Sequence, residues 1–301
     1  MRPSLTRFAW LSVAAAILII ALKAWAYWLT GSVALLSDAL ESLVNLAAAG
    51  AALFVLTIVA RPADDDHPFG HDKAEYFSSG LEGGLILIAA LAIIIASIER
   101  LIHPQPLGPL GLGLAVSFAA SVINFAVARV LLTAAQRHHS IALEADAKHL
   151  MTDVWTSVGV LIGVGAVSVT GWQWLDAAVA IGVALNIIRT GIELLRRSVL
   201  GLMDTALPAE ELAAIEGALE RYRAEGIAFH ALRTRQSGAR RFVDVHVLVP
   251  GAWPVQRGHD LVERIEHEIC ERLPHASVFT HLEPLEDPAS YEDQRLDRTH
   301  A

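Results

Sequence analysis

The chain has 301 residues, of which 54% are hydrophobic and only 18% are charged, and its formal net charge is −9. A soluble domain has about 25% charged and about 45–50% apolar residues, so this composition excludes an ordinary soluble protein. The acidic charge argues against nucleic acid as a partner, because there is no basic stripe. A single cysteine, Cys270, excludes a disulfide framework and a multi-cysteine zinc site.

Long apolar runs fill the chain up to Asp204, and most of the charge follows it, which predicts a membrane domain followed by a soluble one. Six segments are long enough to cross a bilayer core, which takes about 20 helical residues. The first follows Arg2 and Arg7 as a secretory signal would, but it is too long for one. The predicted spans are Phe8–Leu29, Val33–Ala60, Phe77–Ile102, Leu107–Leu132, Ile141–Val169 and Trp174–Leu195.

The basic residues near the ends of these segments predict the orientation of the protein in the cell (inner) membrane. If the spans alternate, one side has Arg2, Arg7, Arg61, Lys73, Arg137, Arg196 and Arg197, and the other has Arg100, with Lys23 near the end of the first span. Loops rich in Lys and Arg stay in the cytoplasm. We therefore expect both termini to be cytoplasmic.

The second predicted span contains Glu41 and Asn45, and the fifth contains His149 and Asp153. Both pairs have i,i+4 spacing, so the two side chains of each pair point the same way from a helix. Ionisable side chains inside a membrane span face a partner or a cavity, because burying one in lipid costs about 2.5–3.5 kcal/mol. Asp38 lies one turn before Glu41.

Four oxygen and nitrogen ligands from two facing helices predict a tetrahedral site for a metal such as zinc. The sequence shows no Lys or Arg beside these residues, so a bound cation would supply the balancing charge. The alternative is a buried hydrogen-bonded network that holds two helices together. Ser, Thr or Asn side chains would hold two helices together at a lower desolvation cost than ionisable ones. The ionisable residues therefore favour the metal site over the structural network.

The soluble part shows the order helix, strand, strand, helix, strand. A helix with one apolar face is followed by two strands joined at residues 236–239, then by a second helix and a third strand. This order predicts an α+β, ferredoxin-like domain with helices on one face of the sheet. The segments are Pro208–Ala224, Ile227–Arg235, Arg241–Val249, Pro254–Arg272 and Ala276–Leu282. The predicted domains are residues 1–204 and 205–286, followed by a polar, disordered tail, 287–301.

Four stretches in order resemble the cation diffusion facilitator family: residues 31–45, 67–75 (HPFGHDKAE), 145–153 and 230–238 (HALRTRQSG). The resemblance implies a homodimer that exports zinc, iron, manganese, cobalt or cadmium in exchange for protons. The resemblance implies that such metal ions are both the substrate and the regulator, and it implies no organic cofactor. Besides a second copy of the chain, metal ions and protons, the expected partner is the lipid bilayer.

The resemblance also implies roles for individual residues. It assigns the transport site to Glu41, Asn45, His149 and Asp153, a loop site to Asp64, His67 and His71, and a cytoplasmic site to His230, His246, His259, His281 and Glu283. It further implies a salt bridge between Lys73 and Asp204 that joins the two domains across the dimer. An acidic turn that only attracts cations is the alternative for the loop, and two surface charges are the alternative for the salt bridge.

Asn45 departs from the aspartate typical of the family's bacterial zinc and iron exporters, and Glu283 replaces an aspartate. A neutral amide carbonyl is a harder and weaker ligand than a carboxylate, and this difference favours manganese or iron over zinc. The sequence does not determine which metal is the substrate. Asp38 could restore the missing charge. Protons compete with metal for the same ligands, and histidine, the residue type at position 149, has an unperturbed pKa of about 6.5. Proton antiport follows as a prediction.

Two other classes of function are alternatives to transport. An intramembrane metalloprotease is excluded, because His267 and Glu268 begin an HExxH pattern whose second histidine is replaced by Glu271, outside the spans. A membrane sensor or scaffold that binds metal without transporting it remains an alternative.

Overall fold

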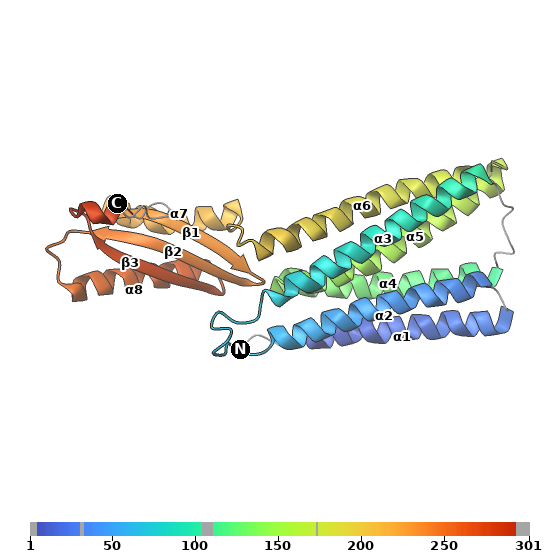
Figure 1. Ribbon diagram of the computed structural model, residues 1–301, viewed down its shortest axis with the longest axis horizontal. Coiled ribbons are helices and arrows are strands. Elements are labelled where there is room, and N and C mark those ends of the chain that lie inside the picture. The colour runs from blue at the N-terminus through green and yellow to red at the C-terminus, as the bar shows by residue number, and fades with distance from the viewer. Residues whose placement is uncertain (1–4, 31–32, 104–110, 173, 293–301) are drawn as a thin grey trace. The chain divides into compact units, whose positions relative to one another are not determined.

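The computed structural model describes residues 5–30, 33–103, 111–172 and 174–292, in two compact units, Met1–Val199 and Leu200–Ala301. The first unit is a helical bundle, and the second has a sheet and two helices (Figure 1). The bundle contains α1 (Thr6–Thr30), α2 (Val33–Val59), α3 (Ala74–Ile102), α4 (Gly111–His138), α5 (Ile141–Thr170) and α6 (Trp174–Leu202). Each of the six predicted spans therefore corresponds to a helix, and residues 107–110 of the fourth lie outside the described residues.

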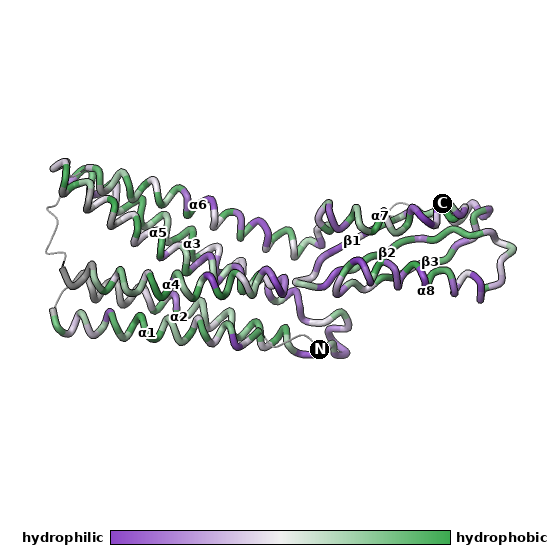
Figure 2. Tube along the Cα trace, turned by 180° about the vertical axis from the view of Figure 1, so that it is seen from behind, coloured by the Kyte–Doolittle hydropathy of each residue, from purple (hydrophilic) through white to green (hydrophobic). Residues whose placement is uncertain are grey.

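Within the described residues, α1, α3, α4 and α6 are long and apolar enough to cross a membrane. The other two, α2 and α5, carry the polar residues of the predicted transport site, and parts of both lie outside the described side chains. The apolar colouring of the bundle is shown in Figure 2. Two helices are longer than the spans predicted for them: α4 continues past Leu132 and α6 past Leu195. In α4, Arg137 and His138 in the last turn stabilise the extension by interacting with the helix dipole.

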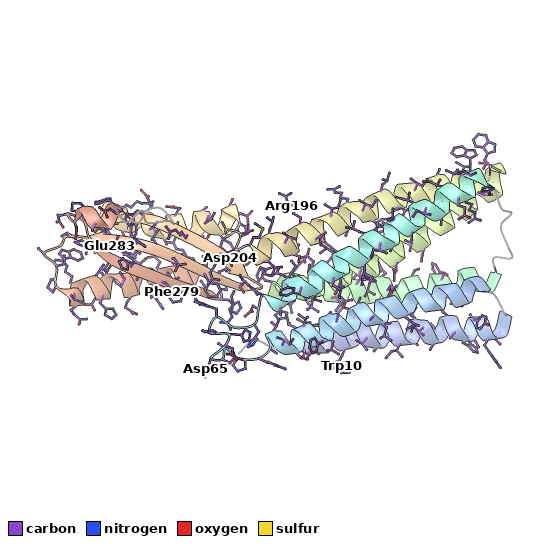
Figure 3. All side chains as sticks on the ribbon, in the orientation of Figure 1. Trp10, Asp65, Arg196, Asp204, Phe279 and Glu283 are labelled. Atoms are coloured by element: carbon purple, nitrogen blue, oxygen red, sulfur yellow. The ribbon has the colours of Figure 1, made fainter. Side chains whose placement is uncertain are left out.

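Many large apolar side chains lie on the outside of the bundle, and small and polar side chains are buried inside it together with Ile and Leu. Trp10 projects from α1 and is 60% exposed (Figure 3), whereas Ser12 on the same helix is fully buried. Gly83 of α3 lies against Gly191 of α6, so closely that a Cβ at Gly83 would come within 3.2 Å of the Gly191 carbonyl oxygen. Small residues at such a contact let helix backbones approach closely in a membrane.

A buried glutamate fixes the start of α5. Ser140 is the N-cap, and its hydroxyl accepts from the backbone N–H of Leu143 and donates to Oε2 of Glu75 at 2.6 Å. The same carboxylate oxygen accepts from the N–H of Ala142 at 3.2 Å. A carboxylate at a helix N-terminus interacts favourably with the helix dipole and with its free N–H groups. Glu75 of α3 thus holds the start of α5 in place.

The second unit has the predicted order of elements. They are α7 (Ala209–Ala224), β1 (Ala228–Ser237), β2 (Arg240–Val249), α8 (Val255–Arg272), β3 (Ala276–Pro284) and the 3₁₀ helix η1 (Pro288–Tyr291). The strand order is β1-β2-β3, with β1 and β2 antiparallel and β2 and β3 parallel. Strand side chains alternate, so Val243, Val245 and Val247 of β2 all face the core that contains Ile215 of α7 and Ile265 of α8. Both helices therefore cover one face of the sheet, as predicted.

Two local features complete this unit. The hairpin between β1 and β2 has a two-residue turn in which Gly238 takes a φ of +57°, a conformation that favours glycine. The expectation of disorder from residue 287 is corrected by η1. The Asp287 side chain caps this helix, and the Tyr291 hydroxyl donates to the Leu285 carbonyl. Residues 293–301 lie outside the described residues.

Candidate metal centres

Three histidines form a row across the sheet of the second unit. His230 of β1 is the register partner of His246 of β2, which is the register partner of His281 of β3. The ring centroids are 4.9 Å apart for the first pair and 5.0 Å for the second. His246 alternates with the core valines of β2, so the row lies on the sheet face opposite α7 and α8.

Glu283 joins this row because it lies two residues after His281 on the same face of β3. Its Oε2 is 2.8 Å from Nε2 of His230 and 3.2 Å from Nδ1 of His246, and its Oε1 is 3.4 Å from Nε2 of His281. Figure 3 labels Glu283 in the second unit. The carboxylate is 6% exposed, and the Tyr291 ring packs edge-on against His230.

The ligand atoms of His230, His246 and Glu283 all lie within 4.8 Å of one another, so these side chains could hold a metal ion. Carboxylate and imidazole ligands suit zinc and other divalent transition metals. His281 is adjacent but 62% exposed at its side chain. His259, on α8, is 4.0 Å from Glu263 and is not part of this close group in the described chain.

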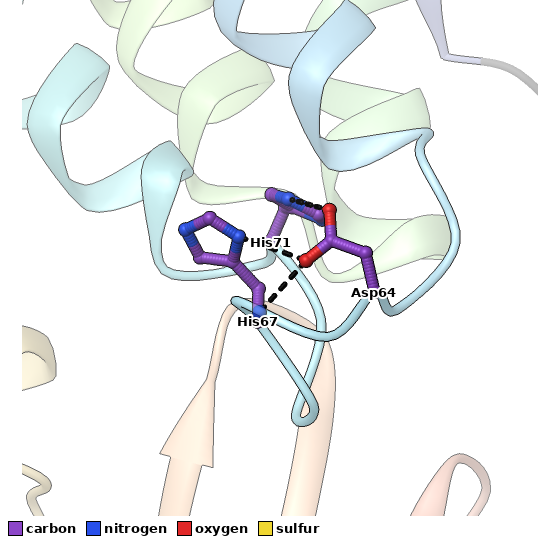
Figure 4. Close-up of side chains that lie close together, drawn as sticks. All are labelled: Asp64, His67 and His71. Carbon is purple, nitrogen blue, oxygen red and sulfur yellow. Dashed lines mark hydrogen bonds and ion pairs between the residues drawn. The ribbon is translucent and has the colours of Figure 1, made fainter.

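A second group lies in the loop between α2 and α3 (Figure 4). Asp64 Oδ1 is 3.0 Å from Nδ1 of His67, and Oδ2 is 3.3 Å from Nε2 of His71. The His67 backbone N–H also donates to Asp64, at 2.7 Å. Gly70 has a φ of +86°, which allows the tight turn that brings the two imidazole rings to a centroid distance of 4.4 Å.

Electrostatics favour the ionised form of Asp64, the form that binds metal. Desolvation raises the pKa of this carboxyl group, but the hydrogen bonds from the His67 side chain and backbone and the charges of His67 and His71 outweigh it. The net pKa is therefore below the ordinary value. Ligand atoms of all three residues lie within 4.8 Å of one another, which is compatible with a metal ion.

The described part of the intramembrane site is centred on Asn45 of α2. Its Oδ1 is 2.9 Å from Nε2 of His149, and its Nδ2 donates to Oδ2 of Asp153 at 2.5 Å. The amide thus bridges the two α5 residues that the sequence places one turn apart. The side chains of Asp38 and Glu41 lie outside the described residues.

The structure adds two residues that the sequence reading missed. Asn124 of α4 donates to Oδ2 of Asp153 at 3.2 Å. A cavity of about 70 Å³ is lined by Asn45, Asp153, Asn124 and Lys23, among other residues. The expectation that no Lys or Arg lies beside this site is therefore wrong. Lys23 of α1 reaches the cavity because α1 packs along α2, where its ammonium donates to the Ser42 hydroxyl at 2.9 Å.

Lys73 and Asp204 fall in different units. Lys73 is the N-cap residue of α3, and Asp204 lies 3.5 Å from Arg235 within the second unit. Their predicted pairing across a dimer stays a prediction.

These features define a multi-pass membrane protein with an α+β domain and two groups of described side chains that could hold a metal ion. Residues 9–203 match the family description "Cation efflux transmembrane domain", and residues 207–285 match "Cation efflux protein, cytoplasmic domain". The chain belongs to the cation diffusion facilitator family of metal transporters, as its resemblance implied. The function that family membership supports is the efflux of metal cations, and its cytoplasmic domain supports dimerisation.

Curated relatives are similar to this chain over nearly its whole length. The chain is 54% identical to "Uncharacterized transporter sll1263" of Synechocystis sp., covering 95% of this chain and 92% of the relative. It is 32% identical to "Cation-efflux pump FieF" of both Shigella flexneri and Escherichia coli, covering 93% of this chain and 92% of each relative. A solved structure titled for CzrB in its Zn form is 31% identical and covers 27% of this chain and 91% of that chain, with a TM-score of 0.25.

Proposed function

We propose that this protein exports a divalent transition-metal cation across the inner membrane in exchange for protons. The observation that carries the proposal is the contact of one amide, Asn45, with both His149 and Asp153 beside a polar cavity. The two contacts place ligands from α2 and α5 together inside a membrane bundle. Polar residues at such a position are expensive unless they bind an ion or each other.

Metal binding would replace the contacts that the side chains now make with one another. The Asn45 carbonyl oxygen, the His149 ring nitrogen and an Asp153 oxygen would turn to the ion, with Glu41 as the fourth ligand. Each ligand except Asn45 must lose its proton to bind well, so protons and metal compete for the same site. This competition supports exchange as the means of transport.

The donor set supports manganese or iron(II) as substrate over zinc. Asn45 contributes a neutral carbonyl oxygen, and the second amide, Asn124, holds Asp153 by a hydrogen bond. The Lys23 ammonium in the same cavity offsets part of the carboxylate charge. A harder, less negative site favours metals that prefer oxygen ligands.

Flux into proteoliposomes tests the transport proposal. Zinc, iron(II), manganese, cobalt and cadmium would be compared with and without an imposed pH gradient. Asp153→Ala should abolish flux, whereas Ser157→Ala, a matched change in the cavity lining, should retain it. Metal flux that ignores the pH gradient would exclude antiport. Loss of resistance to metal in cells that express Asp153→Ala separates a transporter from a sensor or scaffold, which would keep its response.

Asn45→Asp tests the metal assignment. A second carboxylate should shift preference toward zinc, and the ratio of zinc to manganese flux should rise. An unchanged ratio would show that Asn45 does not determine the choice of metal.

Metal at the cytoplasmic site would regulate a homodimer by drawing its two cytoplasmic domains together. His230, His246 and Glu283 form the core of this site, and His281 and His259 would complete it on metal binding. Cys270 is exposed and is the single cysteine of the chain, so a spin label there reports the distance between subunits without engineering. Adding metal to chelator-treated protein should shorten that distance, and Glu283→Gln should prevent the change. Equal distances in the stripped and loaded protein would contradict this regulation.

The loop site at Asp64, His67 and His71 would bind a further ion, and the Lys73–Asp204 pair would link the domains between subunits. Both termini would lie in the cytoplasm. Labelling Cys270 from the two sides of sealed vesicles tests the orientation: only the reagent on the cytoplasmic side should react.

A further inference from the structure

Glu82 of α3 is a buried carboxyl group that the proposed transport site does not use. It is 0% exposed, and within the described part of the chain neither side-chain oxygen has a hydrogen-bond partner. Its neighbours on the same helix face include Ile86 and Ala90, which pack in an apolar cluster with Ala145 of α5 and Leu194 of α6. A carboxylate in such surroundings would carry an uncompensated charge.

A second buried carboxyl group is Asp146 of α5, the helix on which α3 packs. Asp146 is 2% exposed; its Oδ1 accepts from the Ser12 hydroxyl at 2.9 Å, and its Oδ2 has no partner among the described residues. Glu82 and Asp146 are thus two buried carboxyl groups on helices that pack together, each with at least one oxygen that has no described partner. A charge on either would be costly in this low-dielectric interior, and a charge on both would be more costly still.

The other helices provide little compensation for a negative charge on Glu82. On α2, the segment from Ser42 to Val59 contains no ionisable residue. On α6, Glu193 lies 3.2 Å from Lys148 and Arg197 pairs with Glu144, so these charged groups are paired with α5 side chains. Among the described side chains, the groups that act on Glu82 are the Asp146 carboxyl of α5 and the Ser78 hydroxyl of α3; Asp38 and Glu41 of α2 lie outside the described side chains.

We propose that Glu82 is a proton-binding site, separate from the metal ligands, that is protonated when the transport site lacks a cation and ionised when a cation binds. This inference rests on the proposed function. On release, the carboxyl O–H bond breaks, the electron pair stays on the oxygen and the proton passes to water. Glu82 would therefore supply part of the proton count of the exchange.

The fifth helix provides the coupling between the two sites. Asp146, His149 and Asp153 occupy successive turns of α5, so a divalent cation at His149 and Asp153 raises the local positive potential near Asp146 and Glu82. That potential favours the ionised carboxylate. By linkage, protonated Glu82 weakens metal binding as strongly as metal favours proton release.

Calorimetry of the full-length protein in detergent tests the inference. Manganese would be titrated at one pH into buffers of different ionisation enthalpy, which gives the number of protons released per metal bound. Glu82→Gln keeps the shape of the protonated side chain but cannot lose the proton. It should release about one proton fewer per chain than the wild type. The loop and cytoplasmic sites contribute equally to both proteins and cancel in the difference.

Two further variants make the result decisive. Glu75 is another buried glutamate of α3, and it accepts hydrogen bonds from Ser140 and Ala142. The variant Glu75→Gln should leave the number of protons released per metal unchanged. If Glu82→Gln does not fold, Glu82→Met provides the same test with an apolar side chain. An unchanged proton count in a Glu82 variant that still binds manganese would overturn the inference.

The outcome also separates this inference from the proposed function. If the wild type and Asp153→Ala release equal numbers of protons, no proton is linked to the transport site, and both proposals fail. The wild type could instead release more protons than Asp153→Ala but the same number as Glu82→Gln. In that case proton exchange at the transport site is supported and the proposed role of Glu82 is refuted.

Discussion

The close contact between α3 and α6 predicts that alanine at Gly83 destabilises the bundle. The adjacent Gly84 provides a matched control, because the two glycines differ in their surroundings. A Cβ at Gly83 would lie 3.1 Å from the Leu195 backbone nitrogen and 3.2 Å from both the Gly191 carbonyl oxygen and Leu194 Cβ. A Cβ at Gly84 would have nothing within 4 Å. Backbone atoms cannot rotate away, so alanine at Gly83 requires the α6 backbone to move by a few tenths of an ångström.

The expected magnitude follows from two opposing terms. Overpacking costs about 1–3 kcal/mol, whereas replacing glycine by alanine in a helix gains about 0.8–1.0 kcal/mol. Both variants share the gain, but only Gly83→Ala has the overpacking cost. Gly83→Ala should therefore be less stable than Gly84→Ala by about 1–3 kcal/mol, and Gly84→Ala should equal or exceed the wild type.

Unfolding in mixed detergent and SDS micelles measures this difference, with fluorescence from the seven tryptophans as the signal. The two variants would be compared with the wild type in the same detergent series. Equal stability of Gly83→Ala and Gly84→Ala would refute the close α3–α6 contact. A Gly83→Ala variant that is more stable than the wild type would refute it as well.

Three further predictions concern polar contacts. Ser140→Ala removes the N-cap of α5 and one donor to a buried carboxylate, and should lower stability in the same assay by about 0.5–2 kcal/mol; no loss would contradict the cap. Asn124→Leu leaves Asp153 with one amide donor fewer and should weaken metal binding about 10–100-fold, as judged by calorimetry; unchanged affinity would show that this contact does not orient the ligand. The Asp64 carboxyl, whose folded pKa is depressed, contributes stability above its ordinary pKa of 3.8 that is lost as the pH falls through the lower folded value. Carboxyl NMR should therefore place its midpoint below 3.8, and a midpoint at or above 3.8 would contradict the hydrogen bonds from His67.

Local patterns in the sequence were sufficient for the elements and for several candidate ligands. The apolar segments predicted the six helices of the bundle, of which α1, α3, α4 and α6 are long and apolar enough to cross a membrane in the described residues, because length and hydropathy are properties of one continuous stretch. The alternation in β2 predicted which side chains face the core and therefore placed His246 on the opposite face. Asn45, His149 and Asp153 could be paired in advance, because i,i+4 spacing fixes a common direction on each helix.

Tertiary structure alone decided which side chains from different helices meet. Lys23 and Asn124 lie beside Asn45, although α1 and α4 contain no pattern that marks either residue as part of a site. Glu82 and Asp146 likewise become neighbours through the packing of α3 on α5. The physical reason is that hydropathy determines that a helix is buried, whereas its rotation and crossing angle depend on how its side chains fit the neighbouring helices.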